Sequence, residues 1–179
     1  VKLTTFKCRA LKAALASAVA LGGVAPSLNA HAATATGTAT ATVVTPISIS
    51  AGNNLRFGSF STTAANQTVT VNATTGNRTN SGAILVPAVA GGAGSFTVTG
   101  DGVLTYAITL PSNGVVTIAT GAGDAPRTMA VSDFTSNPSG TGILTAGSQT
   151  LSVGATVTTV TGQIAAAYTG TYDVTVVYN

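Results

Sequence analysis

The sequence contains no tryptophan, a single cysteine and a single histidine among its 179 residues. Cys8 and His31 both fall within the first 32 residues, and no lysine or glutamate follows residue 32. Beyond residue 32 the chain can therefore form no internal disulfide and no thiolate metal site. General acid–base catalysis relies on histidine, lysine or carboxylates with shifted pKa values, and a hydroxyl nucleophile needs such a base. These absences predict that the protein is not an enzyme.

Charge is equally scarce, at 6% of all residues. The charged residues after residue 32 give that part of the chain a net charge of −1, and they are Arg56, Arg78, Arg127, Asp101, Asp124, Asp133 and Asp173. Scattered arginines form no basic patch for nucleic acid or for an anionic membrane. The aspartates are also dispersed, without the D-x-D spacing of a calcium loop. We therefore expect no nucleic-acid partner, no metal and no cofactor.

The first 32 residues have the three-part organisation of a secretory signal peptide. Four basic residues precede an apolar stretch over residues 13–25, and Ala30-His31-Ala32 provides an A-x-A cleavage site. The apolar stretch is shorter than the roughly 20 residues that a membrane-spanning helix needs. We expect cleavage before Ala33, export through the periplasm to the cell surface, and no transmembrane segment in the processed chain.

The rest of the chain is rich in threonine, valine, alanine and glycine, and it has no stretch with helical apolar spacing. Short alternating segments separated by Gly, Asn, Asp or Pro instead predict strands. The expected strands cover residues 38–50, 55–60, 67–73, 83–89, 95–100, 104–110, 115–119, 127–134, 149–158 and 171–179. The turn Ser112-Asn113-Gly114 predicts a hairpin between the strands on either side of it. Loops are expected at 90–94, 121–125 and 137–142.

This pattern predicts an all-β fold, either an antiparallel sandwich or a barrel. Alternate apolar residues of each strand should point inward. The expected inward residues are Val69, Val71, Phe96, Val98, Leu104, Tyr106, Ile108, Leu110, Leu151 and Val153.

Two segments at opposite ends of the processed chain predict strand addition. Residues 171–179 alternate, so the last predicted strand has one apolar face and forms an open sheet edge. Residues 33–50 alternate small residues with threonine and have the pattern of a further strand. An acceptor edge and a donor strand in one chain predict a subunit that polymerises.

Six motifs, taken in order, resemble a family of exported bacterial proteins known as a domain of unknown function. They are Val44-Thr45-Pro46-Ile47-Ser48-Ile49, Leu55-x-Phe57-Gly58, Phe96-x-Val98-x-Gly100, Tyr106-x-Ile108-x-Leu110-Pro111, Gln149-Thr150-Leu151-Ser152-Val153-Gly154-Ala155, and Tyr168-x-Gly170-x-Tyr172-x-Val174-x-Val176-x-Tyr178-Asn179. The family is similar to chaperone/usher pilins, especially the archaic, spore-coat-U-like group. The chain departs from many such pilins in having no disulfide.

The pilin resemblance implies an immunoglobulin-like antiparallel β-sandwich over residues 51–179, preceded by the signal peptide at 1–32 and a donor-strand arm at 33–50. The implied donor positions are Ala35, Gly37, Ala39, Ala41, Val43, Ile47 and Ile49. One wall of the implied acceptor groove consists of Tyr172, Val174, Val176 and Tyr178. The implied function is a structural subunit of an extracellular filament, a pilus or fimbria for cell adhesion. Its implied partners are copies of itself, a periplasmic chaperone and an outer-membrane usher.

Two other interpretations stay open. The arm could close its own sandwich, which would make the protein a self-complemented secreted or surface module whose end loops bind a glycan or a surface partner. Alternatively, edge-to-edge pairing could build a non-filamentous coat. The four tyrosines fall mostly on predicted inward positions, which disfavours a large aromatic binding surface.

Overall fold

The computed structural model describes residues 32–123 and 126–179. The chain divides into two units, Val1–Ala41 and Thr42–Asn179, and every described strand lies in the second. In the first unit, residues 32–41 are exposed and belong to no strand. The expected signal peptide lies outside the described residues except for Ala32.

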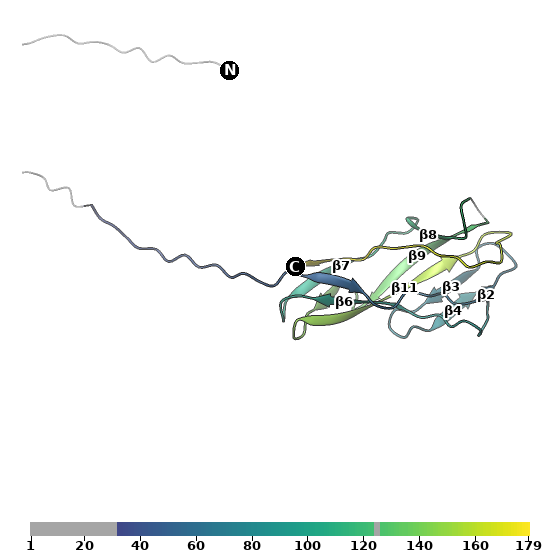
Figure 1. The fold of residues 1–179 in the computed structure, drawn as a ribbon, viewed down its shortest axis with the longest axis horizontal. Coiled ribbons are helices and arrows are strands. Elements are labelled where there is room, and N and C mark those ends of the chain that lie inside the picture. The colour runs from purple at the N-terminus through teal and green to yellow at the C-terminus, as the bar shows by residue number, and fades with distance from the viewer. Residues whose placement is uncertain (1–31, 124–125) are drawn as a thin grey trace, which may run out of the picture. The chain divides into compact units, whose positions relative to one another are not determined.

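The second unit is built from strands, and no helix occurs in the ranges that the structure describes (Figure 1). The strands are β1 (Ser48–Ala51), β2 (Phe60–Ser61), β3 (Thr68–Val71), β4 (Arg78–Ser81), β5 (Ile84–Leu85), β6 (Gly94–Thr99), β7 (Thr105–Thr109), β8 (Val116–Ala119), β9 (Thr128–Asn137), β10 (Thr141–Ile143), β11 (Ser148–Thr158) and β12 (Thr175–Tyr178). Over residues 32–123 and 126–179, no helix is long and apolar enough to cross a membrane.

Seven of these strands form the largest sheet, in which β11 is the central strand (Figure 1). Residues 148–153 of β11 pair with β6 and residues 156–158 pair with β3, so β6 and β3 follow one another along one edge of β11. β9 pairs with the opposite edge. The sheet continues from β6 to β1, from β3 to β4, and from β9 to β8. A smaller sheet has the order β10-β7-β12, and β2 pairs with β5; all pairs are antiparallel.

Two clusters of buried side chains form the core. The first comprises Val69, Ala83, Val116, Met129, Val131, Ala155 and Val157. The second comprises Val98, Tyr106, Leu144, Leu151 and Val153. Because Val98 and Leu151 belong to the seven-stranded sheet and Tyr106 to the three-stranded one, both sheets bury side chains in the second cluster. The fully buried Tyr106 satisfies its hydroxyl by donating a 2.8 Å bond to Gln149 Oε1.

The structure confirms an all-β, antiparallel fold and much of the predicted inward face. Six of the predicted residues are at most 1% exposed: Val69, Val71, Val98, Tyr106, Leu151 and Val153. The other four, Phe96, Leu104, Ile108 and Leu110, are half-buried. Alternation of period two is a local property of a strand, so it predicts which face a residue occupies without knowledge of the partner strand.

The predicted hairpin of residues 104–110 with 115–119 is wrong. A turn does form, with Gly114 at φ +83°, but β7 pairs with β10 and β12, whereas β8 pairs with β9. The side chain of Asn113 accepts a 2.8 Å bond from the Asp133 amide and donates a 2.9 Å bond to the Asp133 carboxylate. These bonds tie the turn to β9, so the chain passes from one sheet to the other instead of folding back on itself.

Several other segments differ from expectation. Residues 38–47 form no strand, and the expected strand at 55–60 is reduced to a bridge at Arg56 and to β2. β4 forms from residues without apolar alternation, and the expected loop at 137–142 overlaps β10. Within β10, Gly142 gives space to Tyr106, because a Cβ at residue 142 would clash with the tyrosine ring. That glycine is a packing requirement inside a strand, not a loop signal.

Candidate functional site

β1 and β12 are edge strands in the part of the chain that the structure describes. β1 pairs only with β6, and β12 pairs only with β7. The two strands approach each other through Tyr178, whose hydroxyl donates to the Thr45 carbonyl at 2.7 Å and accepts from the Asp101 amide at 2.7 Å. Two open edges from different sheets therefore lie close together.

A groove of about 1190 Å³ opens between the chain that follows β1 and the chain that precedes β12. Residues 51–62 form its first wall and residues 163–172 form its second wall. Apolar side chains dominate both walls and the base: Leu55, Phe57, Phe60, Phe96, Ile118, Met129, Ile164, Tyr168 and Tyr172. Arg56 is the only charged residue among those that line the groove.

Both walls present backbone amides that have no backbone partner among the described residues. They are the amides of Leu55 and Phe57 in the first wall, and those of Thr171 and Tyr172 in the second, of which only one can point toward the groove because successive amides point to opposite sides. In the first wall, Gly52 N donates to Ser95 O at 2.8 Å and Arg56 N donates to Gly92 O at 2.9 Å. Because successive residues of an extended chain bond to alternate sides, the amides of Leu55 and Phe57 point toward the groove. The groove thus combines apolar pockets with available ladder positions.

Arg78 in β4 holds the first wall. Its Nη1 donates to the carbonyls of Phe57 and Ser59 at 3.0 and 2.8 Å, and its Nη2 donates to the Val86 carbonyl at 3.2 Å. Gly58 between them has φ +68°, and a Cβ there would clash with the Val89 carbonyl and with the guanidinium of Arg78. One planar, permanently charged donor thereby fixes an irregular stretch of backbone that has little ladder pairing of its own.

We expect Arg78→Met to lower the free energy of unfolding by about 2–4 kcal/mol, because three carbonyls lose a charged donor in a partly buried place. Arg78→Lys should recover only part of the loss, since a single ammonium cannot reproduce the planar fork. Urea unfolding measures both effects. Arg127→Met, at an exposed position, is the matched control. Equal losses for Arg78→Met and Arg127→Met would contradict a special role for Arg78.

Gln163 and Tyr168 hold the second wall. Gln163 Nε2 donates to the Pro126 and Thr128 carbonyls at 2.6 and 3.2 Å, and its Oε1 accepts from the Val160 amide at 3.1 Å. The Tyr168 hydroxyl bonds to the Ile164 and Pro126 carbonyls at 2.7 and 3.1 Å. These polar contacts fix residues 160–168 in the absence of a continuous ladder.

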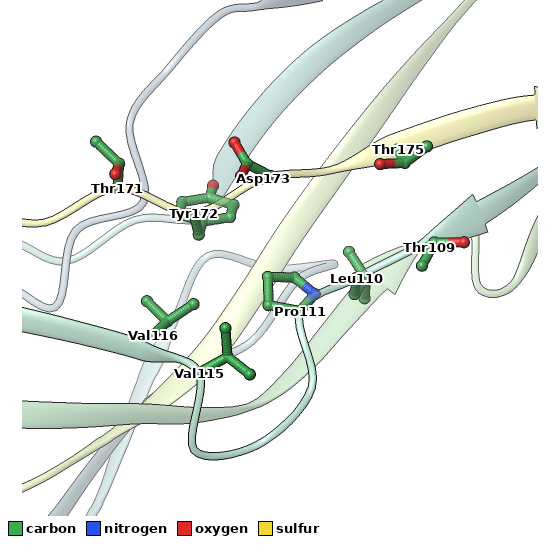
Figure 2. Close-up of a pocket in the computed structure, with 9 residues that line it drawn as sticks. All are labelled: Thr109, Leu110, Pro111, Val115, Val116, Thr171, Tyr172, Asp173 and Thr175. Carbon is green, nitrogen blue, oxygen red and sulfur yellow. The ribbon is translucent and has the colours of Figure 1, made fainter.

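Tyr172 stands where the second wall meets the core. Its ring packs edge-on against Phe96, with centroids 6.0 Å apart, and at a tilt against Phe134, with centroids 5.3 Å apart. On the other side of the same chain segment lies a cavity of about 410 Å³, where Thr171–Thr175 face residues 109–116 (Figure 2). Tyr172 lines both the groove and this cavity, so it separates two poorly filled spaces.

Burial raises the pKa of the Tyr172 hydroxyl and that of Tyr106. The folded protein therefore keeps these protons to a higher pH than the unfolded chain, in which tyrosine has a pKa near 10. The contribution of these two groups to the free energy of unfolding should be constant below about pH 10. It should fall as the pH rises toward their folded-state pKa values. Urea unfolding between about pH 8 and 11 tests this, and Tyr172→Phe should reduce the slope. An unchanged slope in that variant would assign the alkaline loss to other groups.

The four predicted acceptor residues share one face of the chain. Tyr172, Val174, Val176 and Tyr178 are half-buried and pack against the second core cluster, while the residues between them are exposed. Only Tyr172 lines the groove. The groove therefore lies mostly before the predicted acceptor segment, at residues 163–172.

The predicted donor residues divide into two groups. Ala35, Gly37, Ala39 and Ala41 are exposed and in no strand, and Val43 is 95% exposed. Ile47 and Ile49 instead pack against the second core cluster, and Ile49 is paired with Val98 in the ladder between β1 and β6. These isoleucines are half-buried against the core of their own domain, because burial stabilises large aliphatic side chains most. The exposed part of the expected arm therefore ends before Ile47.

Several groove residues were not predicted from the sequence: Leu55, Phe57, Phe60, Ile118, Met129 and Tyr168. The alternations Leu55-x-Phe57 and Tyr168-x-Gly170-x-Tyr172 were visible signals for two facing walls. They could not be joined, because more than a hundred residues separate them and nothing local indicates that they face each other.

A family model described as Domain of unknown function (DUF4402) matches residues 47–178. The chain belongs to this family. The DUF4402 region includes both walls of the groove, and residues 33–46 lie outside it. No curated protein and no solved structure matches the chain significantly. Within the described ranges, the DUF4402 domain has no group of three or more His, Cys, Asp or Glu side chains that could hold a metal ion.

Proposed function

We propose that this DUF4402 protein is a structural subunit of a bacterial extracellular filament, assembled by donor-strand complementation. Residues 33–46 of one subunit enter the groove between residues 51–62 and 163–172 of the next. The observation that carries the proposal is the groove itself, with apolar pockets and unpartnered amides on both walls. Recognition by strand addition uses these two features, backbone bonds for affinity and pockets for alternate side chains.

The exposed part of the arm suits such a groove. Residues 33–46 could extend over roughly 46 Å at about 3.3 Å per residue, and the ten residues of the second wall, which bend at 165–166, span less than roughly 33 Å. Ala35, Gly37, Ala39, Ala41 and Val43 lie on one side of an extended arm. Burial contributes about 0.8 kcal/mol per CH₂, so Val43 supplies the largest apolar contribution and the alanines supply little.

The direction of the walls distinguishes a donor from a second copy from a donor in the same chain. Thr45 precedes the first wall, Tyr178 follows the second, and the Tyr178 hydroxyl bonds to the Thr45 carbonyl. Residues 51–62 also lie opposite residues 163–172. The two walls therefore run in opposite directions. A chain that reversed near residue 46 to fill its own groove would run parallel to the second wall. A strand from another subunit can run the other way, antiparallel to the second wall and parallel to the first, so the two kinds of donor differ in the wall with which they pair antiparallel.

The proposal extends to the finer fold and to the assembly route. The seven- and three-stranded sheets would be the two layers of an immunoglobulin-like sandwich that lacks one strand, as in pilins. Export through the periplasm, with a chaperone that covers the groove and an usher at the outer membrane, follows from the same likeness. The self-complemented module or coat is the competing interpretation, and it differs in placing the arm in its own groove.

Electron microscopy of the exported protein and of material sheared from the producing cells tests the filament. Regular thin filaments are expected in both.

The direction of strand addition is tested with single-cysteine variants in a Cys8→Ser background, where no other cysteine is present. A mixture of Val43→Cys and Ala167→Cys should form disulfide-linked dimers, because Ala167 lines the groove. Ile143→Cys, 49% exposed on β10 and outside the groove lining, is the control. Compact monomers, with cross-linking only when both cysteines are in one chain, would support self-complementation.

A further inference from the structure

The outer face of the seven-stranded sheet is covered almost entirely by hydroxyl groups. Six rows run across the paired strands, and they are Ser48, Thr99 and Ser148; Ser50, Thr97 and Thr150; Ser95, Ser152 and Asn137; Gly154 and Thr135; Thr79, Thr70, Thr156 and Ser132; and Ser81, Thr68, Thr158, Ala130 and Thr117. All but Asn137, Gly154 and Ala130 are serine or threonine. We call this surface the hydroxyl face.

Successive residues of a strand point to opposite faces of the sheet, so the residues between these rows point to the opposite face. Those residues include Val69, Val98, Val131, Leu151 and Val157, all at most 2% exposed in the core. Most row residues are exposed or half-buried, and Thr97, Thr99 and Thr150 are among the exposed ones, whereas Thr156 is buried. The hydroxyls already bond across strands: Ser48 Oγ lies 2.8 Å from Thr99 Oγ1, and Thr70 Oγ1 lies 2.8 Å from Thr156 Oγ1.

The hydroxyl face has no charge in any of its rows. Two charged residues occur in the strands that form it, Arg78 and Asp133. Arg78 is paired with the buried Val71 and bonds to carbonyls near the groove. Asp133 lies at the irregularity of β9 and is bonded to Asn113 and Ser132. Exposed sheets normally carry lysine or other charges that oppose association, and this face has none.

We infer that the hydroxyl face is a contact surface between two copies of this protein, packed face to face. A hydroxyl both donates and accepts, so a face of hydroxyls is complementary to itself, as a two-fold symmetric contact requires. Small side chains also let two twisted sheets approach closely over a broad area. This contact does not rest on strand addition, because none of the row residues lines the groove. In a filament it would join neighbouring filaments side by side.

The size of the face agrees with a pair of copies. β11 has 11 residues and would be roughly 36 Å long at about 3.3 Å per residue. Three to five strands at about 4.8 Å give a width of roughly 14–24 Å, hence an area of roughly 500–850 Å². A specific protein interface buries about 800 Å² on each partner. A neutral polysaccharide is the other hydroxyl-compatible occupant, but the rows contain no aromatic ring on which a sugar could stack.

Cross-linking of the full chain, as exported and in a Cys8→Ser background, tests the contact directly. Thr150→Cys places one thiol near the middle of the hydroxyl face, and Thr141→Cys places one at an exposed position on β10 as the matched control. A bismaleimide about 10 Å long matches the separation of packed sheets. Thr150→Cys should give at least a roughly tenfold higher yield of covalent dimer than Thr141→Cys, because only its thiol faces a partner's copy.

A second pair of variants tests the same surface by charge. Thr97→Lys with Thr150→Lys should weaken self-association roughly tenfold or more in sedimentation, because like charges meet across a symmetric contact. Thr109→Lys with Thr141→Lys, on the three-stranded sheet, should leave it unchanged, and circular dichroism checks folding. If strand addition forms filaments, the first pair should separate bundles into single filaments without shortening them.

Three results would overturn the inference. The first is equal cross-linking of Thr150→Cys and Thr141→Cys when both thiols react with a monofunctional maleimide. The second is equal sedimentation of the two lysine variants. The third is that the protein is retained on a neutral polysaccharide, that Thr97→Lys with Thr150→Lys abolishes this retention, and that no cross-linking occurs between copies. That result would identify a glycan as the occupant.

Discussion

Deletion of residues 33–42 should abolish filaments and leave the domain folded. In the described part of that segment no residue belongs to a strand, and all are exposed, so the domain loses no ladder bond and no core contact. In the proposed filament, each subunit loses its donor strand. Electron microscopy scores the filaments, and circular dichroism with urea unfolding scores the fold. We expect a change in the free energy of unfolding within about 0.5 kcal/mol.

Val43 and Val44 provide a matched pair of substitutions that tests the same arm. Val43→Asp should reduce filament formation strongly, because Val43 lies on the same side of an extended arm as Ala35 to Ala41. Val44→Asp has the same charge one residue away, on the opposite side, and should have the smaller effect. If the deletion unfolds the domain instead, the arm acts within its own chain, and the self-complemented interpretation gains. If both valine variants assemble equally well, the alternating contact is absent.

Tyr172→Ala should be strongly destabilising, with a loss of about 2–4 kcal/mol in the free energy of unfolding. The ring contacts both core clusters and two other aromatic rings, and its removal would join the groove to the neighbouring 410 Å³ cavity. Surrounding residues can collapse little, because a space already lies on each side of the ring. Urea unfolding measures the loss.

Two variants show whether the loss comes from the ring. Tyr172→Phe keeps the packing and should cost less than about 1.5 kcal/mol, since it removes only the hydroxyl. Val177→Ala, in the adjacent strand at a position 59% exposed, should change stability by no more than about 0.5 kcal/mol. A loss for Tyr172→Ala no larger than that for Val177→Ala would mean that the ring does not connect the two clusters.

Strands and their inward faces followed from local pattern, and pairing did not. Val98 and Leu151 alternate with serine and threonine, so their burial could be predicted from their own segments. The hairpin expected around Asn113 fails because Asn113 bonds to Asp133, twenty residues away, and this contact leads the chain into the other sheet. A turn motif specifies a reversal of direction, but the packing of distant strands selects the partner.

The candidate site shows the same division. Tyr172 was expected in the acceptor region from the alternation of its own segment. The opposite wall is formed by Leu55 and Phe57, and it depends on Arg78 from a strand that no apolar pattern indicates. Ile47 and Ile49 continue the alternation of the arm in sequence, but Ile49 pairs with Val98 of β6 and both side chains pack against the second core cluster.

By itself, the sequence determined the amino-acid composition of this protein and the alternation of apolar with polar or small residues along its strands. Those two properties predict an all-β fold, the face that each strand residue occupies, and a chain after residue 32 that contains no thiol, histidine or lysine. Tertiary structure alone decided which strands pair, where β1 and β12 leave open edges, and that residues 51–62 and 163–172 face each other across a groove. The reason is physical: side-chain direction is set within two or three residues, whereas pairing depends on contacts between segments that only the folded core brings together.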